Sequence, residues 1–140
     1  MRRLHVIAAM AVVVLASPVL AWFAVGDTSE AVPNPDYMFR PPSLSTTQEL
    51  ALGATAFALG ATAAVVVVSA LRSGVVALRE LAPAVPLLLA GAFLGLAGRI
   101  VTAGVSGANI GGGLVILFGP FVLLAFVVWS VILWRRAAAG

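Results

Sequence analysis

The chain contains four long apolar runs, each about as long as a lipid bilayer is thick. They lie at residues 4–25, 50–71, 81–101 and 114–134. An α-helix of about 20 residues, rising ~1.5 Å per residue, crosses a hydrocarbon core of ~30 Å. Because lipid offers the backbone no hydrogen-bond partner, each run is predicted to be a helix, even the strand-like valines at 66–68.

The composition points to the same class of protein. Hydrophobic residues make up 62% of the chain and charged residues only 9%, against about 25% charged residues in soluble domains. The net charge of +3 comes from dispersed arginines, so no nucleic-acid partner is expected. The chain has no cysteine and no lysine, which excludes disulfides, thiolate metal sites and a phosphate-loop lysine. We expect no cofactor.

Three connections of different character join the runs. Residues 26–49 are rich in proline and acidic side chains, residues 72–80 form a short basic turn, and residues 102–113 are small and glycine-rich. None of them is predicted to fold alone. The expected fold is therefore an all-α membrane protein, a four-transmembrane-helix bundle forming one domain over residues 1–140, in a bacterial plasma membrane.

The arginines predict the orientation of the bundle. With a cytoplasmic N-terminus, six arginines lie inside, and Arg40 and Arg99 lie outside with four of the five acids. The six are Arg2, Arg3, Arg72, Arg79, Arg135 and Arg136. This is a positive-inside pattern, and it predicts that both termini are cytoplasmic and that 26–49 and 102–113 are outer loops. Alternatively, residues 1–21 are a cleaved signal peptide, although the apolar run is longer than a usual signal core.

The second and third runs each carry a face of small residues. In the second, Gly53, Ala56, Gly60 and Ala63 share one side of a helix, and in the third Gly91, Gly95 and Gly98 do so. Small side chains let membrane helices approach closely, and dispersion then holds them together. Since a short turn joins the two runs, we expect these faces to pack directly on each other. The alternative is that small residues are merely abundant.

A hydroxyl stripe runs along another side of the second helix. Thr55, Thr62 and Ser69 recur at heptad spacing within the repeat ALGATAFALGATAA and beyond it. Such hydroxyls usually bond back to a carbonyl of their own helix. They could instead line a polar path, or form hydrogen bonds to another helix or protomer.

Two charged residues near the outer surface are candidates for function. Arg99 lies far along the third run, where it could extend to the interface, pair with Glu49, or bind an anion or substrate. Glu49 also completes a capping-box pattern with Thr46 as N-cap, which is the role that we favour for it.

Three further features have a structural and a functional interpretation. Pro120 breaks one hydrogen bond in the fourth run, as a plain kink or as part of a transport path. Residues 104–113 match no phosphate-binding pattern and are expected to form a flexible hairpin, or else a re-entrant or ligand-binding loop. The segment 37–39, Tyr-Met-Phe, is expected to cover the bundle or touch lipid, or else to dock a partner.

These patterns favour a structural role over catalysis. No pair of carboxylates lies within one helix and the chain has a single histidine, so an enzyme is not expected. The predicted function is a small accessory or scaffold subunit that associates with the bilayer and, through small-residue helix faces, with itself or another membrane protein. The alternative is a small channel or transporter using Thr55, Thr62, Ser69, Arg99 and the Pro120 kink.

Overall fold

The computed structural model describes residues 3–139, so Arg2, one of the six arginines predicted to lie inside, is outside the described residues. The described chain is helical, with one isolated β-bridge between Asp36 and Val105. Its helices are α1 (Arg3–Val25), α2 (Thr46–Arg72), α3 (Leu78–Leu81), α4 (Ala84–Thr102) and α5 (Ile110–Ala139). Four helical segments, with α3 and α4 counted as one, are long and apolar enough to cross a membrane. They indicate an integral membrane protein.

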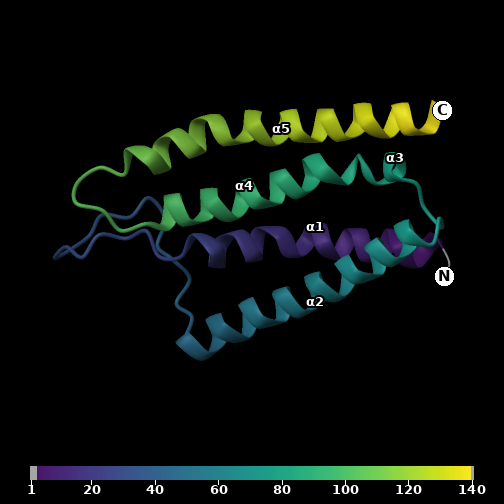
Figure 1. Cartoon of the computed structure of the whole chain (residues 1–140). Helices are drawn as coiled ribbons and strands as arrows, with labels where there is room; N and C mark the ends of the chain where they lie inside the picture. The colour runs from purple at the N-terminus through teal and green to yellow at the C-terminus, as the bar shows by residue number, and fades with distance from the viewer. Residues whose placement is uncertain (1–2, 140) are drawn as a thin grey trace.

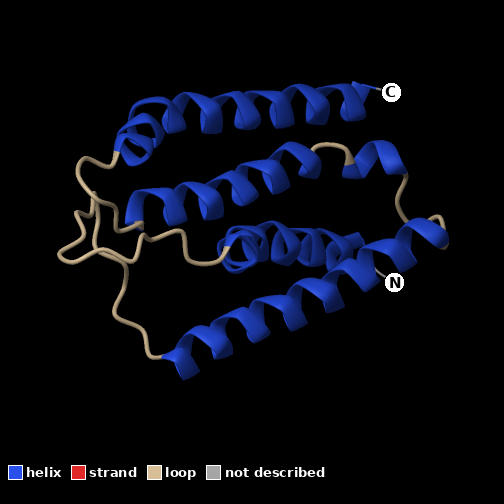
Figure 2. Ribbon diagram, turned by 60° about the vertical axis from the view of Figure 1, so that its left-hand side comes forward, coloured by secondary structure: helices blue, strands red, loops and turns tan. Residues whose placement is uncertain are grey.

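The four long helices stand side by side in an open row, in the order α2, α1, α4, α5 (Figures 1 and 2). The bundle is therefore not closed: α2 and α5 are its two edges. Within an apolar 18-residue stretch of each span, only 11% of the residues are buried for α2 and for α5, against 28% for the span that contains α4. Lipid solvates an apolar helix face about as well as another helix does, so nothing forces the row to close.

The two ends of the row differ in charge. Both described termini and α3 lie at one end, and the long loops lie at the other (Figure 1). The first end carries Arg3, Arg72, Arg79, Arg135 and Arg136, with Glu80 as its acid. We call it the basic end, and the opposite one the loop end. The four acids of the loop end are Asp27, Glu30, Asp36 and Glu49.

The helices are longer than the apolar runs, and the third one is broken. The first turns of α2 and α5 are formed by residues 46–49 and 110–113, which were expected in loops. Once the start of a helix is capped, polar or glycine residues can extend it into the membrane interface. The turn 72–80 contains the start of α3. Pro83 lies between α3 and α4, where its ring has no N–H to continue the ladder. Ser130 of α5 donates to the Pro83 carbonyl oxygen at 2.7 Å and so satisfies it.

The expected pairing of the two small-residue faces is wrong, because both faces pack on α1 from opposite sides (Figure 1). A Cβ built at Gly60 of α2 would lie 3.4 Å from the Ala16 Cβ, and one built at Gly98 of α4 would lie 2.7 Å from the Trp22 ring. The prediction assumed that helices joined by a short turn are neighbours. The segment 73–83, which contains α3, instead passes the end of α1. The helix α1 therefore lies between α2 and α4 and contacts both with small residues of its own.

The N-terminus of α2 is capped one residue earlier than predicted. Ser45 is the N-cap and accepts from the Gln48 amide at 3.3 Å, while the Gln48 side chain accepts from the Ser45 amide at 2.9 Å. Thr46 and Glu49 are therefore not the capping pair. The pairs Ser45–Gln48 and Thr46–Glu49 both fit the pattern of Ser or Thr followed three residues later by Gln or Glu. The helix begins at Thr46, one residue earlier than predicted, and this makes Ser45 the N-cap.

Candidate functional site

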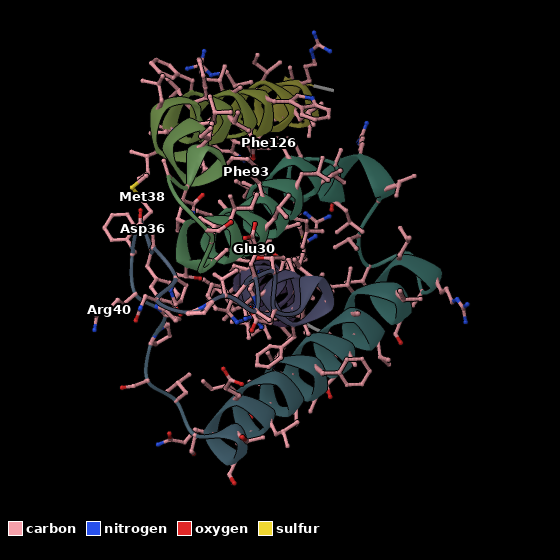
Figure 3. The ribbon with its side chains drawn as sticks, turned by 90° about the vertical axis from the view of Figure 1, so that its left-hand side faces the viewer. Glu30, Asp36, Met38, Arg40, Phe93 and Phe126 are labelled. Carbon is pink, nitrogen blue, oxygen red and sulfur yellow. The ribbon has the colours of Figure 1, made fainter. Side chains whose placement is uncertain are left out.

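The loops at the loop end form one hydrogen-bonded layer. Asp36 and Val105 exchange two backbone hydrogen bonds, of 2.9 and 3.0 Å, and the Glu30 amide donates to the Gly104 carbonyl oxygen at 2.7 Å. Figure 3 views the molecule from this side, with Asp36 and Met38 beside the start of α5. The segment 104–109, expected to be a flexible hairpin, is thus tied to the first loop.

Glu30 joins the two loops through its side chain. Its Oε2 accepts from the Ser106 amide at 3.0 Å and from the Ser106 hydroxyl at 2.7 Å. These two hydrogen bonds stabilise the carboxylate and hold the pKa of Glu30 below its ordinary value of 4.5. Glu30 is fully exposed, so this contact acts on the loop rather than on the whole fold.

The contact should weaken in acid. Because the folded pKa of Glu30 is lowered, the contact is fully present above about pH 4.5 and is lost as the pH falls through the folded pKa. We expect the hydrogen-exchange protection factor of the Ser106 amide, measured by NMR in detergent micelles, to fall over that range. Glu30→Gln should remove most of the pH dependence. A protection factor that ignores both pH and this substitution would contradict the assignment.

Arg99 binds the end of α1. Its Nε donates to the Trp22 carbonyl oxygen at 2.9 Å, and its guanidinium lies 4.2 Å from the centre of the Trp22 ring. A carbonyl left free at a helix C-terminus favours a cation, and the ring adds a cation–π contact. The side chain of Arg99 thus lies on α1 and not on Glu49, which is a half-buried residue of α2. The Arg99 charge also adds to the lowering of the pKa of Asp27, whose main cause is the hydrogen bond from the Ser29 amide.

Asn109 is a residue that the sequence analysis missed. It is buried, its Oδ1 accepts from the Gly112 amide at 2.6 Å, and its Nδ2 donates to the carbonyl oxygens of Ile100 (3.0 Å) and Ala103 (3.2 Å). It therefore caps α5 and ties that cap to the end of α4. Asn is among the most favoured N-cap residues, and its place a few residues before the apolar run is a signal that could have found it. The glycines at 111–113 concealed where the helix begins.

The hydroxyl stripe lies on the face of α2 that points away from α1. Thr55, Thr62 and Ser69 are all exposed, and their hydroxyls make no hydrogen bond within residues 3–139. Their expected bonds to their own helix are therefore not observed. The stripe is available to a partner outside the chain.

The features proposed to line a transport path do not meet within one chain. The hydroxyl stripe is on the outer side of α2, Arg99 packs on Trp22, and Pro120 is exposed on α5 at the other edge of the row. The 37–39 segment lies over the loop end. Its Phe39 amide donates to the Val101 carbonyl oxygen at 3.0 Å, while the Met38 and Phe39 side chains are 40% and 57% exposed.

Comparison of the chain with protein-family models, with curated proteins and with solved structures gives no match.

Proposed function

We propose that the protein is a non-catalytic scaffold or accessory subunit of a bacterial plasma membrane, which pairs with a second copy of itself through the outer face of α2. The observation that carries the proposal is the composition of that face. Six small or β-branched residues follow each other there at alternating spacings of four and three: Ala51, Thr55, Ala58, Thr62, Val65 and Ser69. All six are exposed.

This heptad spacing suits helix pairing. A 4-3 alternation keeps one seam of a helix in contact with a partner at a crossing angle near 20°. Small side chains let two backbones approach, and the unpaired hydroxyls gain interhelical hydrogen bonds. In a two-fold dimer, the outer face of α2 in one copy packs on the same face of the other copy, so a single such face at one edge of the row is sufficient for pairing. The Gly and Ala face of α2 is already used against α1.

The charges support an orientation for such a dimer. We propose that the basic end faces the cytoplasm, with both termini, because it holds five of the described arginines, whereas the loop end holds Arg40 and Arg99. In this orientation the loop layer of Glu30, Asn109 and their partners faces outward.

A single-cysteine cross-linking experiment tests the pairing, and the chain is naturally free of cysteine. Ala58→Cys lies at the centre of the seam, and Ala125→Cys, exposed on α5, is the matched control. In native-like lipid, oxidation should give a covalent dimer with Ala58→Cys and not with Ala125→Cys. Adding Thr62→Leu to Ala58→Cys should reduce the dimer yield severalfold, because the larger side chain separates the two backbones.

Three results would contradict the proposal. One is a monomer with both cysteine variants, and another is equal cross-linking of the two. The third is a closed ring of several copies with Thr55 and Thr62 facing a common axis, which would favour the channel alternative.

A further inference from the structure

A groove lies on one side of the row between α1 and α5, at the basic end. Its volume is about 710 Å³, within the range of roughly 300–1,000 Å³ that is usual for ligand pockets. The groove exists because α1 and α5 are held apart by α4, whose first residues form its floor. Small side chains line it on all three helices and leave the space open, among them Ala11 of α1, Ala84 of α4 and Ala138 of α5.

The length of the groove matches one leaflet of a bilayer. Along α1 it extends from Arg3 to Leu15, which is about 18 Å of helix at ~1.5 Å per residue. Half of a hydrocarbon core of ~30 Å is about 15 Å. A partner helix would occupy the full thickness of the membrane, whereas this groove ends near the middle. Its length thus suits an acyl chain better than a transmembrane helix.

The chemistry of the groove changes along its length. The inner part is lined by aliphatic side chains such as Met10, Val14 and Leu87. Among the described residues, Arg3 and Glu80 are the charged ones that line the groove, and they lie together at the basic end with 3.6 Å between Arg3 Nη2 and Glu80 Oε1. The Arg3 side chain is 73% exposed, so its other N–H groups can still donate. Trp134, which lines the groove near the same end, has the amphipathic ring that favours a membrane interface.

The surroundings of the mouth are positively charged. The basic end carries five described arginines and, as its acid, Glu80, which already pairs with Arg3. A phosphate group there would be attracted by arginines from α1, α3 and α5 together.

We propose that this groove binds one anionic phospholipid, with an acyl chain between α1 and α5 and its phosphate at Arg3. The ligand comes from the leaflet at the basic end. The site does not depend on the proposed pairing, because α2 contributes no residue to it.

Native mass spectrometry of the purified, delipidated chain in detergent tests this site. The probes are phosphatidylglycerol and phosphatidylcholine with identical acyl chains. One phosphatidylglycerol should bind with higher affinity than any further lipid and than phosphatidylcholine. Ala11→Trp fills the centre of the groove and should weaken that first binding event at least about tenfold. Ala125→Trp, on the opposite side of α5 from Trp134 and Ala138, should leave it unchanged.

The headgroup contact is tested separately. Arg3→Gln should reduce the preference for phosphatidylglycerol over phosphatidylcholine severalfold while leaving acyl binding in place. Equal binding of lipid by the chain with and without Ala11→Trp would overturn the site. Equal affinity for the two lipids in the unsubstituted chain would overturn the anionic headgroup. A cross-link between two copies through a cysteine at position 11 would show that protein fills the groove.

Discussion

Gly95→Ala is expected to destabilise the protein by about 1–3 kcal/mol, the range for overpacking a tight contact. A Cβ at position 95 would lie 2.7 Å from the Ala21 Cβ and 2.8 Å from the Trp22 backbone nitrogen, and would also overlap the Pro18 carbonyl oxygen. Two of these three atoms are backbone and cannot rotate away. The sign is informative, because replacing Gly by Ala inside a helix otherwise stabilises it by roughly 0.8–1 kcal/mol.

The matched control is Gly113→Ala in the first turn of α5. The nearest atom to a Cβ there is the Met38 Cε at 3.9 Å, at the flexible end of a side chain. This variant should keep or raise stability. The measurement is the free energy of unfolding in mixed micelles, compared across the two variants. Should both variants shift stability in the same direction by the same amount, α4 would not approach α1 through Gly95.

Asn109→Ala is expected to cost about 2–4 kcal/mol, the sum of a lost N-cap and of carbonyl groups left without a donor. The buried side chain makes three hydrogen bonds that join the start of α5 to the end of α4. Without them, the Gly112 amide should also lose protection from hydrogen exchange. The loss should be local first, since the rest of α5 packs on α4 through other contacts such as Phe93 at Gly119.

Two further variants separate the functions of Asn109. Asn109→Asp keeps the acceptor for the Gly112 amide but places a carboxylate oxygen, in place of the donor, against the carbonyl oxygens of Ile100 and Ala103, so its stability should fall at least as far as that of Asn109→Ala. Ser106→Ala removes an exposed hydroxyl of the same loop and should change stability by less than about 1 kcal/mol. An Asn109→Ala chain as stable as the native one would show that the cap is dispensable.

The helices were predictable because a bilayer leaves the backbone few choices. Runs of about 20 apolar residues can satisfy their amides and carbonyls in lipid only as helices, and the structure has all four. The helix ends were less predictable. Ser45 and Thr46 offer the same cap chemistry one residue apart, and glycines at 111–113 look like a loop although Asn109 caps them into α5.

The contacts of the candidate residues were harder to predict. Gly60 and Gly95 are visible in the sequence as small residues on helix faces, but a face of small residues does not indicate which helix packs on it. The same holds for Arg99, whose charge suggested Glu49 or a ligand, while the structure gives it the end of α1 and the Trp22 ring. Glu30 contacts a residue 76 positions further along the chain, and Asn109 contacts residues up to nine positions away. No local pattern in the sequence predicts the contact of Glu30.

The amino-acid sequence is enough to predict that the chain forms membrane-length helices, where the polar segments between them lie, and which helix faces are small enough for close packing. These properties follow from length, hydropathy and periodicity, which are local. The order α2, α1, α4, α5, the central place of α1, the outward direction of the hydroxyl stripe and the groove between α1 and α5 depend on how the helices pack. Lipid and protein solvate an apolar face almost equally, so hydropathy does not rank one helix neighbour above another. The choice depends on how closely particular backbones can approach.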